Sequence, residues 1–175
     1  RYVMLYQYGN SANPGAHYET TAPEILASLP SITHFVAGLG TGGTLMGTGK
    51  RLKEHSNDIK IIGAVPEPDD RIQGLRSLEE GFIPPILDLN LLDARIMING
   101  EDSFRMTDSL LRKEGVFAGV SSGAVLAAAM KTGQKLEKAN IVCLFADGGW
   151  KYLSTGLWEK DYGDLQETVE GKVWW

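Results

Sequence analysis

Two short runs of small residues, each placed between an apolar segment and a helix-like segment, constrain this sequence most. The first run is Gly-Leu-Gly-Thr-Gly-Gly at residues 38–43, and the second is Gly-Val-Ser-Ser-Gly-Ala at residues 119–124. Glycine lacks a Cβ atom, so clustered glycines let the backbone turn tightly or approach another group closely. Glycine accounts for 21 of the 175 residues, well above its usual share of roughly 7%. We therefore expect both runs to be strand-to-helix turns at which the backbone meets a ligand or a neighbouring element.

The rest of the chain alternates strand-like and helix-like segments. Apolar runs typical of buried parallel strands predict strands at residues 33–38, 59–65, 95–98 and 141–146. Amphipathic or small-residue segments predict helices at residues 22–29, 43–55, 71–80, 101–113 and 121–137. This order predicts an α/β fold with a mostly parallel twisted sheet and helices on both faces. Ligands of such sheets bind at the carboxyl ends of the strands, where both glycine runs fall.

Local signals set several boundaries. Residues 7–17 are rich in turn-forming residues and are expected to be irregular. Thr21 and Glu24 fit a capping box that would begin the helix at 22–29. Gly115 is expected to end the helix at 101–113.

The first glycine run is compatible with two kinds of phosphate site. Residues 38–43 match the G-x-G-x-x-G pattern of dinucleotide-binding folds, and Glu67 lies 24 residues beyond, near the position of the ribose-binding acid in such folds. Thr41 and Thr44 add two hydroxyl donors to the free amides of a helix start, which suits a single terminal phosphate. A tight turn without a ligand is a third alternative. Taken by itself, the run does not separate a dinucleotide from a single phosphate.

The second glycine run is compatible with a structural and a ligand-binding role. A serine at the N-cap would satisfy free amides at the start of the helix, and the neighbouring Gly and Ala would allow close packing. Alternatively, Ser121 faces the same ligand as the first run, since a serine hydroxyl can donate to a ring nitrogen or accept from it.

Several segments together resemble, in their order and spacing, the pyridoxal-phosphate-dependent cysteine synthase family, which has the tryptophan-synthase-β-like fold (fold type II). The resemblance covers residues 2–160 and rests on the motifs Asn13-Pro14, His17-Tyr-Glu-Thr-Thr21 with Pro23-Glu24, Gly38-Leu-Gly-Thr-Gly-Gly-Thr44, Gly81-Phe-Ile-Pro84, Gly119-Val-Ser-Ser-Gly-Ala124 and Asp147-Gly-Gly. Residues 145–155 and the aromatic C-terminal end resemble the actinobacterial branch, which uses O-phosphoserine.

The resemblance implies a cofactor, pyridoxal 5′-phosphate, and a role for each glycine run. The cofactor phosphate would be bound, through amides and hydroxyls, by Gly40, Thr41, Gly42, Gly43 and Thr44. Ser121 would face the pyridine nitrogen. A neutral hydroxyl there makes the ring a weaker electron sink than a carboxylate would, which suits β-elimination and replacement. The implied reaction makes cysteine from an O-activated serine and either sulfide or a sulfur-carrier protein.

The Schiff-base lysine of the family lies in an N-terminal domain, together with the loop that binds the substrate carboxylate. None of the lysines in this chain occupies that position. We therefore expect residues 1–160 to form the cofactor-phosphate-binding domain, as the C-terminal half of a longer enzyme, and residues 161–175 to form a tail. By this interpretation the chain holds no catalytic residue of its own and needs the missing N-terminal half for activity. The family also implies a homodimer.

Arg76 would lie near the pocket for the amino-acid substrate. A guanidinium matches the geometry of a phosphate, so we hypothesise that Arg76 selects O-phosphoserine over O-acetylserine. The alternative is a surface ion pair with Glu79 or Glu80. Residues 171–175, Gly-Lys-Val-Trp-Trp, have three interpretations: a gate over the active-site cleft, a dimer contact, or a disordered end.

Composition argues against several other classes of protein. The formal net charge of −5 gives no reason to bind nucleic acid, and no apolar run reaches the roughly 18 residues of a membrane helix. Cys143 is the only cysteine, so no intrachain disulfide is expected and a cytoplasmic location is predicted. The histidines His17, His34 and His55 show no metal-like spacing with Cys143, so no metal site is expected. Two rival functions remain: a dinucleotide-binding oxidoreductase domain, and a non-catalytic regulatory or sulfur-carrier-binding module.

Overall fold

A four-stranded parallel sheet forms the centre of the computed structural model, which describes residues 2–79 and 81–164. The strand order is β3-β2-β1-β4. The strands are β1 (His34–Gly38), β2 (Lys60–Pro66), β3 (Ala94–Ile98) and β4 (Ile141–Cys143). Each lies where the apolar runs predicted a strand, so the α/β class with a parallel sheet is confirmed.

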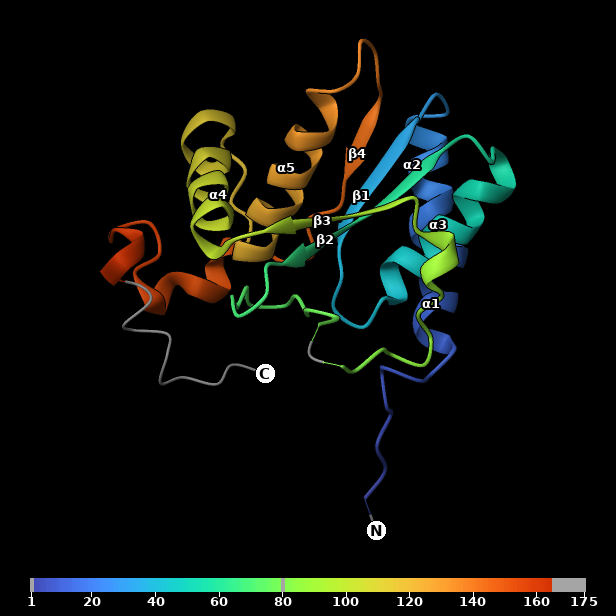
Figure 1. The fold of residues 1–175 in the computed structure, drawn as a ribbon, viewed down its shortest axis with the longest axis horizontal. Helices are drawn as coiled ribbons and strands as arrows, with labels where there is room; N and C mark the ends of the chain where they lie inside the picture. Colours follow the sequence, from blue (N-terminus) through green and yellow to red (C-terminus); the bar gives the residue numbers. More distant parts are fainter. Residues whose placement is uncertain (1, 80, 165–175) are drawn as a thin grey trace.

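Helices cover both faces of this sheet (Figure 1). One face carries α1 (Ala12–Ala16), α2 (Ala22–Ser28) and α3 (Gly43–His55), and the other carries α4 (Gly100–Glu114) and α5 (Val120–Gly133). Three short elements complete the described fold: the π-helical turn η1 (His17–Thr21) and the 3-10 turns η2 (Leu89–Leu91) and η3 (Gly149–Thr155).

Two apolar clusters, one on each face, fix the strands against the helices. Successive residues of a strand point to opposite faces, so Phe35 packs in the cluster with Leu45 of α3 whereas Val36 packs in the cluster with Val125 of α5. All four side chains are at most 1% exposed. Burial on both faces holds the end of β1, and therefore the first glycine run, in a defined position.

Helix α4 shows how the sequence sets helix ends. The side chain of Asn99 accepts a hydrogen bond from the backbone N–H of Asp102 at 2.7 Å, which caps the first turn. Gly115 has φ +68° and ends the helix in the left-handed conformation, as predicted. Arg112 and Lys113 in the last turn complement the helix dipole.

The N-terminal helical region differs from the prediction. Residues 12–16 form α1 instead of an irregular turn, and the π-helical η1 continues directly into α2. Thr21 is helical, with φ −58° and ψ −46°, and among the described residues its side chain caps no helix, so the predicted capping box is wrong. The Thr21 hydroxyl instead hydrogen-bonds the His17 ring at 3.0 Å. Packing of this region on α3 outweighs the turn-forming residues in its sequence.

No helix forms in the described residues 71–79, contrary to the prediction. Gly74 has φ +87°, a left-handed conformation that interrupts a helix. The segment runs instead as turns across the end of β1, where the backbone N–H of Arg76 donates to the carbonyl of Leu39 at 2.8 Å. The side chain of Leu75 fills the space beside Gly38.

The last predicted strand and helix are shorter than expected. β4 has three half-buried residues, because among the described residues it pairs with β1 alone and forms an edge of the sheet. Helix α5 ends at Gly133.

The ring of Tyr162 packs against Phe104 of α4, with centroids 5.9 Å apart. Residues 171–175 lie outside the described residues, so the three interpretations of that segment stay predictions.

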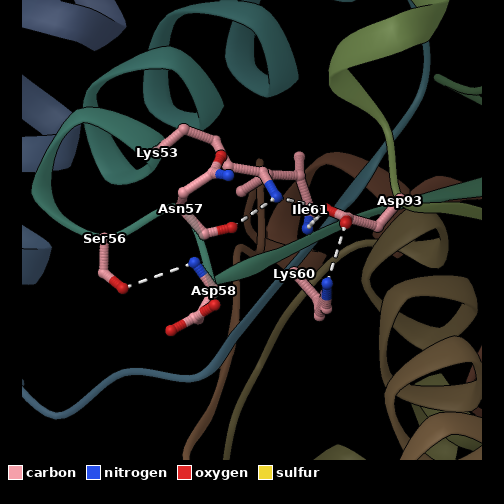
Figure 2. A network of polar contacts seen from close by, with 7 residues as sticks. All are labelled: Lys53, Ser56, Asn57, Asp58, Lys60, Ile61 and Asp93. Carbon is pink, nitrogen blue, oxygen red and sulfur yellow. Dashed lines mark hydrogen bonds and ion pairs between the residues drawn. The ribbon is translucent and has the colours of Figure 1, made fainter.

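Asp93, the residue before β3, connects β2 with α3 at the amino edge of the sheet (Figure 2). Its carboxylate accepts hydrogen bonds from the backbone N–H of Ile61 at 2.8 Å and from Lys60 at 3.3 Å, and it pairs with Lys53 of α3 at 2.9 Å. Partial burial acts to raise the pKa of Asp93, but the contacts with Lys53, Ile61 and Lys60 outweigh burial and hold it below its ordinary value.

Replacing Asp93 by asparagine is expected to lower the free energy of unfolding by about 2 kcal/mol near neutral pH. A carboxylate whose pKa is depressed by folding stabilises the fold above its unfolded-state pKa, and this stabilisation is lost as the pH falls through the folded-state pKa. The difference between the two proteins in urea unfolding should therefore shrink as the pH falls below the ordinary pKa of an aspartate, about 3.9. A difference that does not change with pH would show that the charge of Asp93 plays no part.

Candidate functional site

Both glycine runs lie at the carboxyl edge of the sheet. The first begins at Gly38, the last residue of β1, and leads into α3 at Gly43. The second leads into α5, and the backbone N–H of Gly119 donates to the carbonyl of Asp147, just beyond β4, at 3.0 Å. Because β1 and β4 are parallel neighbours, their carboxyl ends bring the two runs to the same edge.

Gly74 lies between the two runs. A Cβ atom on Gly40 would sit 2.8 Å from the carbonyl oxygen of Gly74, and a Cβ atom on Gly74 would sit 3.7 Å from the hydroxyl of Ser121. The segment predicted as a helix at 71–80 is therefore a loop that contacts both runs. Its role could not be seen in the sequence, because the contact depends on the left-handed backbone of Gly74.

Two side chains from the N-terminal helical region contact the hydroxyls of Thr41 in the first run and of Thr44 directly after it. The Thr41 hydroxyl oxygen accepts from the Asn13 amide nitrogen at 3.0 Å and from the Gly43 backbone N–H at 3.2 Å. The Thr44 hydroxyl hydrogen-bonds Nε2 of His17 at 3.1 Å. The prediction from sequence gave Asn13 and His17 no role in the site. Their spacing of four residues, which puts them on one helix face, is the signal that could have found them.

The electrostatics at the start of α3 favour an anion. Gly42 has φ +90°, and the helix that follows is 13 residues long with no acidic residue in its first turn. Free amides and the helix dipole make such a start attractive to negative charge. Burial lowers the pKa of His17, so its ring is neutral near neutral pH. The first run thus offers a set of amide and hydroxyl donors.

Ser121 is the second residue of α5 and is 8% exposed. Gly119 occupies the N-cap position with extended backbone, so the interpretation of this serine as a side-chain cap is wrong. The hydroxyl of the next residue, Ser122, is buried and has no hydrogen-bond partner among the described residues. The start of α5 therefore has serine hydroxyls that are not used for capping.

Arg76 sits beside the first run. Its guanidinium carbon lies 5.5 Å from the ring centroid of Tyr8 and 5.1 Å from that of Phe82. The two rings pack edge to face, 5.5 Å apart. Stacking on aromatic faces restricts where a guanidinium can point. Glu80, one of the two ion-pair partners considered from the sequence, lies outside the described residues.

The Asp147-Gly-Gly motif anchors the chain after β4. The Tyr152 hydroxyl donates to Oδ2 of Asp147 at 2.9 Å, and Lys151 pairs with the same oxygen at 3.2 Å. Burial, followed by the hydrogen bond to Asp147, raises the pKa of Tyr152, which keeps it a neutral donor. The motif therefore holds the loop after β4 against the start of α5.

Comparison with known families identifies the class of cofactor. Residues 1–147 match a family described as pyridoxal-phosphate dependent enzyme. The chain belongs to this family. Membership of this family favours a cofactor with a terminal phosphate over the dinucleotide alternative, in which Glu67 would bind a ribose. Glu67 follows β2 at the same edge, and its backbone N–H donates to Ile98 at 3.0 Å.

The pyridoxal-phosphate dependent enzymes similar to this chain include several cysteine synthases. The cysteine synthase of Aquifex aeolicus is 45% identical over 92% of this chain and 51% of its own length. Cysteine synthase B of Pseudomonas aeruginosa is 38% identical over 89% of this chain and 52% of its own length. The probable cysteine synthase of Bacillus subtilis is 42% identical over 87% of this chain and 53% of its own length. The chain thus spans about half the length of the curated relatives it matches.

The donor set of the first run fits the phosphate of the family's cofactor, because a phosphate dianion accepts hydrogen bonds and α3 begins without an acidic residue in its first turn.

Within residues 2–79 and 81–164, no three or more His, Cys, Asp or Glu side chains are grouped to bind a metal ion. None of the helices in these described ranges has both the length and the apolar character of a membrane span.

Proposed function

We propose that this chain is the cofactor-phosphate-binding half of a cysteine synthase, an enzyme that replaces the β-substituent of an activated serine with a sulfur nucleophile. The position of Gly74 between Gly40 and Ser121 is the observation that supports the proposal most, because it relates both glycine runs to one region of the sheet edge. The cysteine synthases that the chain resembles support the reaction class.

Each glycine run has a distinct role in this proposal. The cofactor phosphate is bound by Gly40, Thr41, Gly42, Gly43 and Thr44. Ser121 presents its hydroxyl to the pyridine nitrogen, and its low exposure keeps water from competing for that hydrogen bond. Bound pyridoxal phosphate supplies an electron sink for the reacting amino acid. A neutral partner at the ring nitrogen suits elimination and replacement.

The remaining machinery is assigned to other parts of the polypeptide. We place the Schiff-base lysine and the substrate-carboxylate loop in a segment that precedes this chain, and we expect residues 1–160 to act as its cofactor-phosphate domain. By intact enzyme we mean this chain together with the segment that precedes it in this proposal. A homodimer and a second substrate, either sulfide or a sulfur-carrier protein, complete the proposal.

Binding of pyridoxine 5′-phosphate to the apo form of the intact enzyme tests the cofactor site. This compound has the ring and the phosphate but no aldehyde, so its affinity does not depend on a Schiff base with the lysine. We expect it to bind more tightly than pyridoxine, which lacks the phosphate, and more tightly than NAD. Equal affinities for pyridoxine and its phosphate ester would remove the phosphate-binding role of residues 40–44.

Arg76 makes O-phosphoserine the preferred substrate in this proposal. Its backbone N–H donates to Leu39 of the first glycine run, and its guanidinium is stacked on Tyr8 and Phe82. The planar fork of donors on that guanidinium suits a phosphate monoester. An acetyl ester carries no charge to pair with that fork. The same side chain therefore separates the two activated serines by charge.

Replacing Arg76 by alanine in the intact enzyme is expected to lower kcat/KM for O-phosphoserine at least about tenfold more than for O-acetylserine. Steady-state kinetics with both substrates measure the two losses. Arg71→Ala is the matched control, because Arg71 is exposed and lies in the same loop. Equal losses for both substrates in the Arg76 variant would place the selectivity elsewhere.

A further inference from the structure

The hydroxyls of Thr41, in the first glycine run, and of Thr44, directly after it, both contact one neighbouring helical segment. Asn13 of α1 contacts Thr41, and His17, four residues later, contacts Thr44. A Cβ atom on Gly43 would overlap the Asn13 side chain, and one on Gly47 would overlap the backbone of Pro14. The helical segment therefore lies directly against the first two turns of α3, with no space for a side chain at these two glycines.

Asn13 fixes the direction of the Thr41 proton. The Asn13 amide nitrogen donates both to the carbonyl of Gln7 at 2.8 Å and to Thr41 at 3.0 Å, so its orientation is determined. The Thr41 oxygen also accepts from the Gly43 N–H at 3.2 Å. A hydroxyl oxygen has two acceptor sites, and both are used. Its own proton is left to donate to a group outside this set.

His17 can direct the Thr44 proton in the same way. Its ring nitrogens contact two hydroxyls, Nδ1 with Thr21 at 3.0 Å and Nε2 with Thr44 at 3.1 Å. A neutral imidazole has one N–H, so one of the two nitrogens must accept. If the proton is on Nε2, Thr44 accepts it and keeps its own proton for a ligand. If the proton is on Nδ1, Thr44 must donate to His17 and presents lone pairs to the ligand.

We infer that His17 is a positioning residue for the cofactor phosphate: it holds the Nε2–H tautomer, donates to Thr44, and so turns the Thr44 hydroxyl into a phosphate donor. This inference rests on the proposed function. Thr21 completes the arrangement by donating to Nδ1, so the hydrogen bonds from Thr21 through His17 and Thr44 run in one direction toward the anion. Aligned hydrogen bonds of this kind strengthen one another. A phosphate dianion, which only accepts, selects this tautomer over the other.

Titration of the apo intact enzyme with pyridoxine 5′-phosphate tests the inference. We expect His17→Leu to weaken binding about tenfold, because Thr44 keeps its hydroxyl but loses the hydrogen bond from His17 that orients it. His17→Gln should bind within about threefold of the unaltered enzyme, because its amide N–H can take the place of Nε2–H. If His17 only packed against the site, glutamine would not restore the affinity that leucine loses.

His34→Leu is the matched control. His34 is also part-buried and hydrogen-bonds a threonine, Thr33, at 2.8 Å, but it lies at the amino end of β1, at the opposite edge of the sheet. Its replacement should leave the affinity unchanged. The inference is overturned if His17→Leu binds as tightly as the unaltered enzyme, or if the two leucine variants lose affinity equally. Failure of the unaltered enzyme to bind pyridoxine 5′-phosphate would instead overturn the proposed function, and this inference with it.

The tautomer itself can be read without a variant. Nitrogen-15 NMR of the unaltered enzyme distinguishes a protonated from an unprotonated ring nitrogen. We expect the His17 ring, with pyridoxine 5′-phosphate bound, to carry its proton on Nε2. A proton on Nδ1 in that complex would overturn the inference whatever the variants show, including the case in which His17→Leu fails to fold.

Discussion

Replacing Gly123 by alanine is expected to lower the free energy of unfolding by about 3 kcal/mol. A Cβ atom at this position would overlap the carbonyl oxygen of Ser103 and lie 2.7 Å from the backbone nitrogen of Thr107. Both atoms belong to the backbone of α4, so the clash cannot be relieved by a change of rotamer. Helices α4 and α5 would have to separate, which would open the apolar cluster beneath them. Urea unfolding of the intact enzyme measures the effect.

Gly133→Ala in the same helix is the control for Gly123→Ala. Its Cβ atom would meet only the end of the Ile141 side chain, at an ordinary 3.6 Å. This variant should be neutral or slightly stabilised, because alanine favours helix over glycine. A similar loss in both variants would mean that the close approach at Gly123 is not what limits stability.

Replacing Gly42 by alanine is expected to weaken binding of pyridoxine 5′-phosphate at least about tenfold and to cost about 2 kcal/mol of stability. Gly42 has φ +90°, which costs a residue with a side chain about 1–2 kcal/mol. The new Cβ would also lie 3.0 Å from Leu87. Relief of either strain moves the amides that begin α3. Titration of the apo intact enzyme measures the affinity.

Gly115→Ala separates the cost of backbone strain from the loss of the site. Gly115 has φ +68° and open space where a Cβ would be, and it ends α4 at the helix end opposite to the one that follows β3. Its replacement should cost stability in the same way but leave the affinity for pyridoxine 5′-phosphate unchanged. Equal losses of affinity would show that the Gly42 effect is only general destabilisation.

The elements predicted well from the sequence are those whose signals are local. Helix α3 runs from Gly43 to His55 as predicted, because the glycine run marks its start and the apolar spacing continues to its end. Helix α4 follows its Asn99 cap and its Gly115 end. The α/β class follows from the alternation of apolar runs with helix-like segments.

The elements predicted poorly depend on contacts between distant segments. Residues 12–21 contain turn formers but become helical because they pack on the glycine face of α3, at Gly43 and Gly47. The loop at Gly74 carries apolar spacing that suits a helix, yet contact with Gly40 and Ser121 holds it in turns. The same dependence explains the site: residues 40–44 and Ser121 could be nominated from the two glycine runs, whereas the spacing of Asn13 and His17 is informative only once their segment is known to be helical.

Gly74 gives the carboxyl edge a property that neither glycine run has alone. It touches Gly40 on one side and Ser121 on the other, so three stretches far apart along the polypeptide meet at one glycine. A molecule that binds both runs therefore connects these three stretches, and its binding free energy stabilises them together against thermal unfolding. The free energy of unfolding should rise with the logarithm of the ligand concentration, once that concentration exceeds the dissociation constant.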